Sequence, residues 1–153
     1  MTNDEPIVKE IVIDGSPDEI YAFLTDPAKI ARWIGTEIDV DPKPGGVFRI
    51  VPNHRDIILG EYRETIPSRK VSFTWGFDGP GHTVYAGSTL VEITLEREGS
   101  GTRLRLVHRG LSGEARERHA FGWDHYLSRI KAVAEGTDPG VDAFSDPAIV
   151  HSM

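Results

Sequence analysis

The sequence predicts an α+β domain in which an antiparallel sheet of about seven strands is covered by one long C-terminal helix. Short segments with alternating apolar and polar side chains occupy residues 7–15 and much of residues 36–109. Two short helical segments lie between these two regions. A long amphipathic segment, from about residue 113 to 135, follows the last strand and supplies the cover.

The first strand is expected at residues 7–15, where IVKEIVIDG alternates apolar and polar residues. Ser16 is then a good N-cap for the helix in SPDEIYAFLTD, because a proline follows it and Glu19 completes a capping box. Asp26, again followed by proline, caps a second short helix that Gly35 ends.

Six further strands are predicted between residues 36 and 110. They are residues 36–42, 46–52, 57–67, 70–77, 88–98 and 102–110. Most of the connections between them are turn-rich and of hairpin length, so neighbouring strands are expected to pair antiparallel. The alternation leaves one face of this sheet apolar, and that face must be covered.

The long C-terminal helix provides this cover. At about 100° per residue its apolar side chains form one stripe. The stripe consists of Ala120, Trp123, Tyr126, Leu127, Ile130, Val133 and Ala134. We therefore expect residues 1–136 to form one domain, followed by a turn-rich tail at residues 137–153.

Composition restricts the class of function. The 153 residues carry a net charge of −7, which argues against a nucleic-acid partner because such binding needs a basic face. The chain contains no cysteine, which excludes disulfides, thiol catalysis and thiolate metal sites. It shows neither a signal-peptide pattern nor an apolar run long enough for membrane insertion, so we expect a cytoplasmic protein.

Four segments in this order resemble the family of homologues of the activator of heat-shock protein 90 ATPase, a branch of the START-like or SRPBCC superfamily. The segments are residues 13–35, 60–75, 106–111 and 122–136, and the resemblance extends over about residues 7–136. It implies a helix-grip fold, in which a curved antiparallel sheet wraps around the C-terminal helix. It also implies a cavity between sheet and helix and a small apolar ligand.

Residues that face this implied cavity can be named from their positions on the predicted strands and helices. They are Trp33, Phe48, Ile50, Phe73, Trp75, Leu106, His108, His119, Trp123, Tyr126 and Leu127. The alternative is that these side chains form an ordinary core. The two interpretations are most evenly balanced for the tryptophans and Tyr126, whose polar atoms need partners when they are buried.

None of the six histidines lies in a metal-binding motif, so neither a metal nor another cofactor is expected. If the protein is an enzyme, His108 is the best general acid or base, because histidine titrates near neutral pH. The segment GFDGPG (residues 76–81) is glycine-rich without opening a helix, and it suggests a mobile lid over the cavity.

Binding of a small hydrophobic or amphipathic molecule is the function favoured by the sequence. One alternative is a co-chaperone-like domain that acts on a heat-shock protein 90-type ATPase, and another is a cyclase or hydrolase that uses the same cavity. Phe121 lies opposite the apolar stripe, where it suits a homodimer contact or a docking place for the tail.

Overall fold

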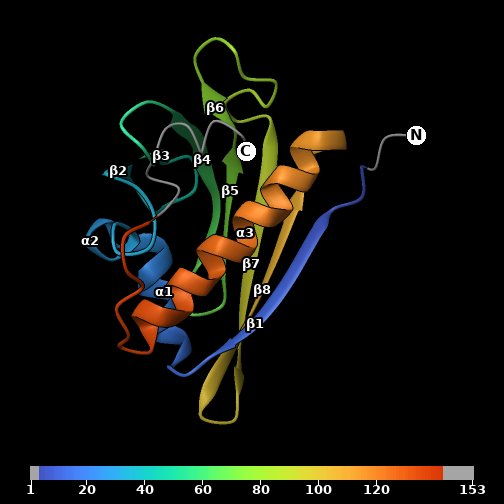
Figure 1. Cartoon of the computed structure of the whole chain (residues 1–153). Coiled ribbons are helices and arrows are strands. Elements are labelled where there is room, and N and C mark those ends of the chain that lie inside the picture. The colour runs from blue at the N-terminus through green and yellow to red at the C-terminus, as the bar shows by residue number, and fades with distance from the viewer. Residues whose placement is uncertain (1–3, 143–153) are drawn as a thin grey trace.

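A curved antiparallel sheet wraps around the long helix α3 in the computed structural model, which describes residues 4–142 (Figure 1). Within those residues the elements are β1 (Ile7–Ile13), α1 (Pro17–Thr25), α2 (Pro27–Ile30), β2 (Glu37–Val40), β3 (Val47–Val51), β4 (Ile57–Ile66), β5 (Lys70–Trp75), β6 (Phe77–Asp78), β7 (Thr89–Glu98), β8 (Gly101–Arg109) and α3 (Gly113–Ala134). The strand order is β1-β8-β7-β5-β4-β3-β2, and β6 pairs with β4. The predicted helix-grip fold is confirmed.

Local signals explain where the helices begin. The Ser16 hydroxyl accepts a hydrogen bond from the Glu19 amide at 3.2 Å, and the Asp26 carboxylate accepts one from the Ala28 amide at 3.0 Å. Both caps match the sequence prediction. Ser112 occupies the N-cap of α3, but within the described residues its hydroxyl makes no capping hydrogen bond.

The second helix is shorter than predicted. It ends at Ile30, and the amide of Trp33 then bonds to the carbonyl of Ile30, three residues back, at 3.1 Å. This tighter turn carries Trp33 inward, where its Nε1 donates to the carbonyl of Phe23 at 2.8 Å. Gly35, at φ 90°, then redirects the chain into β2, as its position in the sequence suggested.

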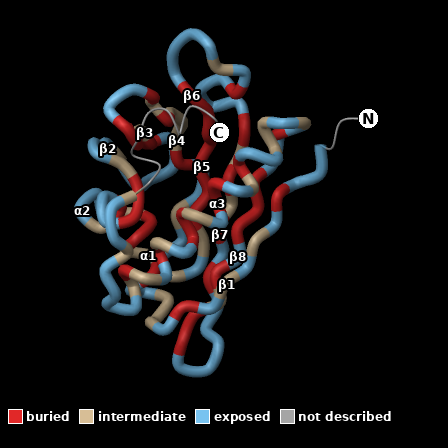
Figure 2. Tube along the Cα trace, in the orientation of Figure 1, coloured by how far each residue is buried: buried red, intermediate tan, exposed pale blue. Residues whose placement is uncertain are grey.

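The hydrophobic core lies between the concave face of the sheet and the helices, where buried segments of β5, β7, β8 and α3 face one another (Figure 2). Five members of the predicted α3 stripe are buried, and its two alanines are half-buried. None of the described helices is both long and apolar enough to cross a membrane.

The described part of the tail, residues 137–142, folds back along α3. Arg129 donates hydrogen bonds to the carbonyls of Pro139 (3.4 Å) and Gly140 (3.1 Å), and His125 Nε2 lies 2.6 Å from an Asp142 carboxylate oxygen. His125 is half-buried, and the Asp142 carboxylate lies against it. The remaining tail residues, 143–153, lie outside the described residues, and the predicted domain boundary at residue 136 stays a prediction.

Two glycines let backbones approach closely next to β5. A methyl group on Gly60 would lie 1.9 Å from the carbonyl oxygen of Thr74, and one on Gly76 would lie 1.7 Å from that of Tyr85. β4 therefore passes close to β5 at Gly60, while Gly76 holds the connection between β6 and β7 against the end of β5.

We expect Gly60→Ala to lower the free energy of unfolding by about 1–3 kcal/mol, because the rigid Thr74 carbonyl must move. Gly15→Ala is the matched control, since its nearest neighbours are the side-chain atoms of Glu19 and Ile20 at 3.3 and 3.4 Å, and it should change stability by less than about 0.5 kcal/mol. Urea unfolding of both variants measures the difference. Equal stabilities would contradict the close approach at Gly60.

Candidate functional site

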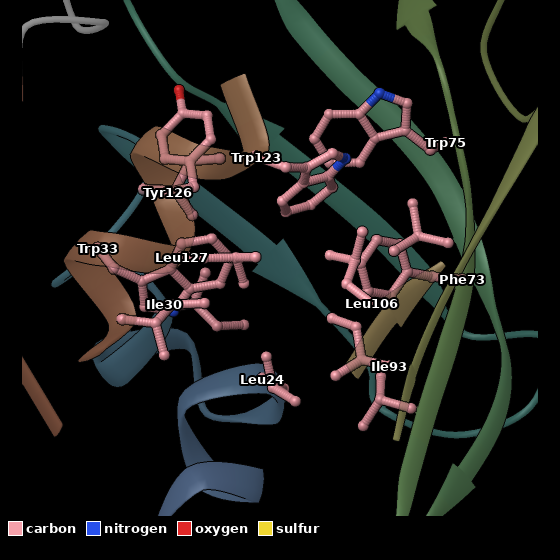
Figure 3. Close-up of a cluster of buried hydrophobic side chains, with 14 of the residues drawn as sticks. Leu24, Ile30, Trp33, Phe73, Trp75, Ile93, Leu106, Trp123, Tyr126 and Leu127 are labelled. Atoms are coloured by element: carbon pink, nitrogen blue, oxygen red, sulfur yellow. The ribbon is translucent and has the colours of Figure 1, made fainter. Parts of the chain in front are cut away.

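The eleven side chains predicted to face a cavity are all buried, and they come together from the α2–β2 corner, β3, β5, β8 and α3. Figure 3 shows several of them: Trp123 extends from α3 toward Trp75 on β5, and Tyr126 and Leu127 come from the same helix. Phe48 and Phe73 stack with ring centroids 4.0 Å apart, and Trp33 and Tyr126 meet edge to face at 6.2 Å. The side chains thus contact one another across the space between sheet and helix.

Trp75 is the central member of this cluster. Its ring centroid lies 5.2 Å from that of Trp123, 5.8 Å from His108, 6.2 Å from His119 and 6.4 Å from Phe77. These separations fall within the range of favourable aromatic contacts. Trp75 therefore joins the packed interior to Phe77, the first residue of β6.

His108 belongs to a closed hydrogen-bond chain. Trp123 Nε1 donates to His108 Nδ1 at 2.9 Å, so Nδ1 carries no proton in this pairing, and the neutral ring carries its proton on Nε2. Nε2 lies 2.8 Å from the Thr89 hydroxyl, which itself donates to the carbonyl of Trp75 at 2.8 Å. Both ring nitrogens of His108 are therefore engaged within the protein.

His119 is paired in the complementary way. Trp75 Nε1 donates to His119 Nε2 at 3.2 Å, and His119 Nδ1 lies 2.8 Å from the carbonyl of Ala115, one helical turn earlier. The proton of the neutral ring is therefore on Nδ1. His119 is 1% exposed and His108 is 0% exposed, which makes both part of the interior.

Burial disfavours the charged form of both rings. It lowers the pKa of His119 to about 4, although the hydrogen bond to Ala115 acts in the opposite direction. Burial, followed by the proximity of His119, lowers the pKa of His108 well below its usual value. A general acid or base at His108 would need a ring nitrogen that faces a ligand and a pKa near neutrality, and the described pairing supplies neither.

A cleft of about 400 Å³ opens beside His119, between the β6–β7 connection and the first two turns of α3. We call it the α3 cleft. Its lining consists of Phe77, Gly81, His82, Thr83, Val84, Ser112, Glu114, Ala115, Arg118 and His119. Its size lies within the range of small-molecule sites, about 300–1,000 Å³.

The α3 cleft overlaps the sequence prediction at one residue. His119 lines it, whereas the other ten residues predicted for the cavity lie in the packed interior beneath it or farther along α3. Phe77, His82 and Val84 were missing from that prediction. The sequence feature that points to these residues is the glycine-rich segment at residues 76–81. The sequence suggests a lid there, and in the structure residues of this segment form part of one wall of the cleft.

A polar chain supports this wall from behind. His82 Nε2 lies 3.3 Å from a carboxylate oxygen of Asp56, and the second oxygen accepts a hydrogen bond from the amide nitrogen of Asn53 at 2.9 Å. Asp56 and Asn53 are buried, at 4% and 0% exposure. Across residues 4–142 no group of three or more His, Asp or Glu side chains is placed to hold a metal ion.

The family of the chain is identified by comparison with known proteins. Residues 14–135 match the family model described as activator of Hsp90 ATPase homolog 1-like protein. The chain belongs to this family. Its helix-grip fold is that of the START-like or SRPBCC superfamily, as the resemblance implied, and this fold is consistent with a ligand-binding domain.

The chain is also similar to individual proteins. The chain is 27% identical over 136 residues to an uncharacterized protein of Schizosaccharomyces pombe, and this match covers 87% of the chain but 38% of the length of that relative. It is similar to the solution structure of an AHSA1-like protein from Rhizobium etli, with 38% identity, a TM-score of 0.69 and coverage of 94% and 89% of the two chains.

A third relative was solved as a dimer. The solution structure of the Aha1 dimer from Colwellia psychrerythraea matches with a TM-score of 0.71, 21% identity and coverage of 86% and 96% of the two chains. At this identity the match shows the fold alone. A homodimer of the present chain stays a prediction, suggested by Phe121, which is 67% exposed on the outer side of α3.

The buried histidines predict a loss of stability in acid. The unfolded chain binds a proton at each histidine near pH 6.5, whereas folded His119 does so near pH 4. The contribution of His119 to the free energy of unfolding is therefore fully present above pH 6.5 and decreases as the pH is lowered toward 4. Between pH 7.5 and 5.0, His119 should contribute about 2 kcal/mol to the decrease in the free energy of unfolding.

Urea unfolding at the two pH values measures this decrease. His119→Gln, which keeps an acceptor for Trp75, should reduce it by about 2 kcal/mol. His54→Asn is the control, because His54 is exposed and asparagine tolerates its positive φ of 66°. An unchanged pH dependence in His119→Gln would mean that His119 is not the source.

Proposed function

We propose that this protein binds a small amphipathic molecule in the α3 cleft. The observation that carries the proposal is a cleft of about 400 Å³ whose lining joins the aromatic interior at Phe77 and His119. Ligand sites usually combine apolar walls with a few polar groups that fix the orientation of the ligand. In the α3 cleft polar groups predominate in the lining, and apolar surface is offered by Phe77, Val84 and Ala115, so the cleft suits an amphipathic rather than a purely apolar ligand.

The lining divides by chemistry. Phe77, Val84 and Ala115 offer apolar surface, while Thr83 and Arg118 offer polar groups. Arg118 pairs with Glu114 at 3.0 Å, and both of these side chains are largely exposed at the rim. A ligand would therefore place its apolar part toward Phe77 and its polar part toward the rim.

This proposal moves the ligand site from a cavity between sheet and helix to the α3 cleft at the edge of the packed interior. Among the predicted residues other than His119, Trp123 contacts Trp75 and donates a hydrogen bond to His108, and these contacts hold α3 against the sheet. The cyclase or hydrolase alternative lacks support at His108, where both ring nitrogens are engaged.

The family match favours a second candidate function, binding to a heat-shock protein 90-type ATPase. The chain spans about two fifths of the length of the curated relative that it matches, so a role in a larger assembly would need additional chain segments or partners. Adding the purified protein to such an ATPase tests this candidate. An unchanged rate of ATP hydrolysis at saturating protein would exclude activation.

Filling the α3 cleft should weaken binding strongly. Ala115→Trp places a large side chain in the cleft, and we expect it to weaken binding of the fluorescent probe 1-anilinonaphthalene-8-sulfonate more than about tenfold, which is about 1.4 kcal/mol. Glu117→Trp, an exposed position on the same helix, is the matched control and should bind within about threefold of wild type.

Fluorescence titration of the three proteins measures this effect, with thermal unfolding to show that each is folded. Native mass spectrometry of protein purified from its own host provides an independent test, because a carried ligand adds mass that is lost on denaturation. Equal probe binding by Ala115→Trp and wild type would place the site elsewhere.

A further inference from the structure

We propose that His82 acts as a gate in the α3 cleft and that Asp56 is the positioning residue that holds this gate closed. In this arrangement the His82 imidazole occupies the face of Phe77 that a planar aromatic group of the ligand would take. The inference deepens the proposed function, since it rests on the same cleft and assigns an aromatic ligand class to it.

Hydrogen bonds in the turn between β3 and β4 position Asp56. The side-chain oxygen of Asn53 accepts hydrogen bonds from the amides of Asp56 (2.8 Å) and Arg55 (3.1 Å), and this fixes the turn between β3 and β4. Asn53 also donates to one Asp56 oxygen, and the other oxygen faces His82 Nε2 at 3.3 Å. The contact is an ion-pair contact between the imidazole and the carboxylate, and Nε2 is the ring nitrogen that faces Asp56.

The burial of Asp56 makes its contact with His82 important for the stability of the turn. A carboxylate that is 4% exposed is costly unless hydrogen bonds or an opposite charge compensate it. Among the described residues, His82 is the basic side chain that forms an ion-pair contact with Asp56. The turn between β3 and β4 thus presents a buried carboxylate to a residue of the β6–β7 connection, which lies next to it in space.

The His82 ring lies against Phe77. The imidazole stacks on Phe77 with ring centroids 4.8 Å apart and planes 16° apart. Phe77 in turn contacts Trp75 and His119 edge to face, at 6.4 and 5.9 Å. His82 therefore covers Phe77, which together with His119 joins the cleft to the aromatic interior.

Three glycines shape the backbone of the β6–β7 connection (residues 79–88). Gly79, Gly81 and Gly87 adopt positive φ angles of 100°, 89° and 69°, a region that favours glycine. The connection is attached to the sheet by hydrogen bonds from Phe77 to Val84 (2.8 Å) and from Gly87 to Leu59 (3.0 Å). The Asp56–His82 contact adds a side-chain attachment near its middle.

The ligand class follows from the shape of the covered surface. An imidazole stacked on Phe77 leaves room for a flat ring when it swings away, and stacked aromatic pairs are favourable at such distances. A molecule with one aromatic ring and a polar substituent would place the ring on Phe77 and leave the substituent at the rim. Opening of the gate would precede or accompany its entry.

The attachment can be tested without any ligand. Asp56→Asn keeps the size of the side chain but removes its charge, and we expect hydrogen exchange of the Phe77 and Gly87 amides to rise about fivefold, by analogy with a weakened charged hydrogen bond. His54→Asn, in the same turn, is the matched control and should leave both rates unchanged. Unchanged exchange in Asp56→Asn would overturn the positioning role of Asp56.

The gate itself is tested with 1-anilinonaphthalene-8-sulfonate as the probe. The double variant His82→Ala/Asp56→Asn removes the gate without leaving an unpaired buried carboxylate, and it should bind the probe about five to ten times more tightly than wild type. Asp56→Asn should add nothing to the effect of His82→Ala, because Asp56 acts through His82. Weaker binding by the double variant would show that His82 is a ligand contact and would overturn the gate.

These two readouts separate the gate from the proposed function. If wild type and all variants fail to bind the probe, the proposed ligand site and the aromatic ligand class are both wrong. The exchange rates then still decide whether Asp56 holds the β6–β7 connection in place.

Discussion

The position of α3 on the sheet depends on pairing the polar atoms of buried tryptophan and histidine rings. Trp75 on β5 donates to His119 on α3, and Trp123 on α3 donates to His108 on β8. Each surface thus supplies one donor and one acceptor to the other. A shift of α3 by one turn, about 5.4 Å, would break both bonds and leave four polar groups unpaired in a dry interior. Apolar packing alone would tolerate many more placements of the helix.

The same pairing determines where ligand chemistry can occur. Among residues 4–142 the interior contains two histidines, but their nitrogens are used to hold α3, and burial favours the neutral form of both rings. Polar recognition must therefore take place where side chains reach the cleft from outside this network. The β6–β7 connection and the first turns of α3 supply such side chains, and His119 and Phe77 form the boundary between the two regions.

Much of this fold could be predicted from the sequence because alternation and helical periodicity assign faces to strands and helices. These patterns correctly placed Trp75, His108, His119 and Trp123 inside, and the caps at Ser16 and Asp26 follow from local hydrogen bonding. Which rings pair could not be predicted, since Trp75 and His119 are 44 residues apart. The early end of α2 was not predicted, and it coincides with a bond between separate elements, from Trp33 to the carbonyl of Phe23, that local patterns do not show.

The α3 cleft could not be predicted from the sequence, for a different reason. Its wall comes from a glycine-rich connection without periodicity, and the conformation of that connection depends on contacts with Leu59 and Asp56, which lie elsewhere in the chain. This separation has a functional consequence. Because the network that positions α3 does not include residues 79–88, changes in that connection can alter the cleft while the helix keeps its place. A domain built in this way can acquire a new ligand preference at little cost to its stability.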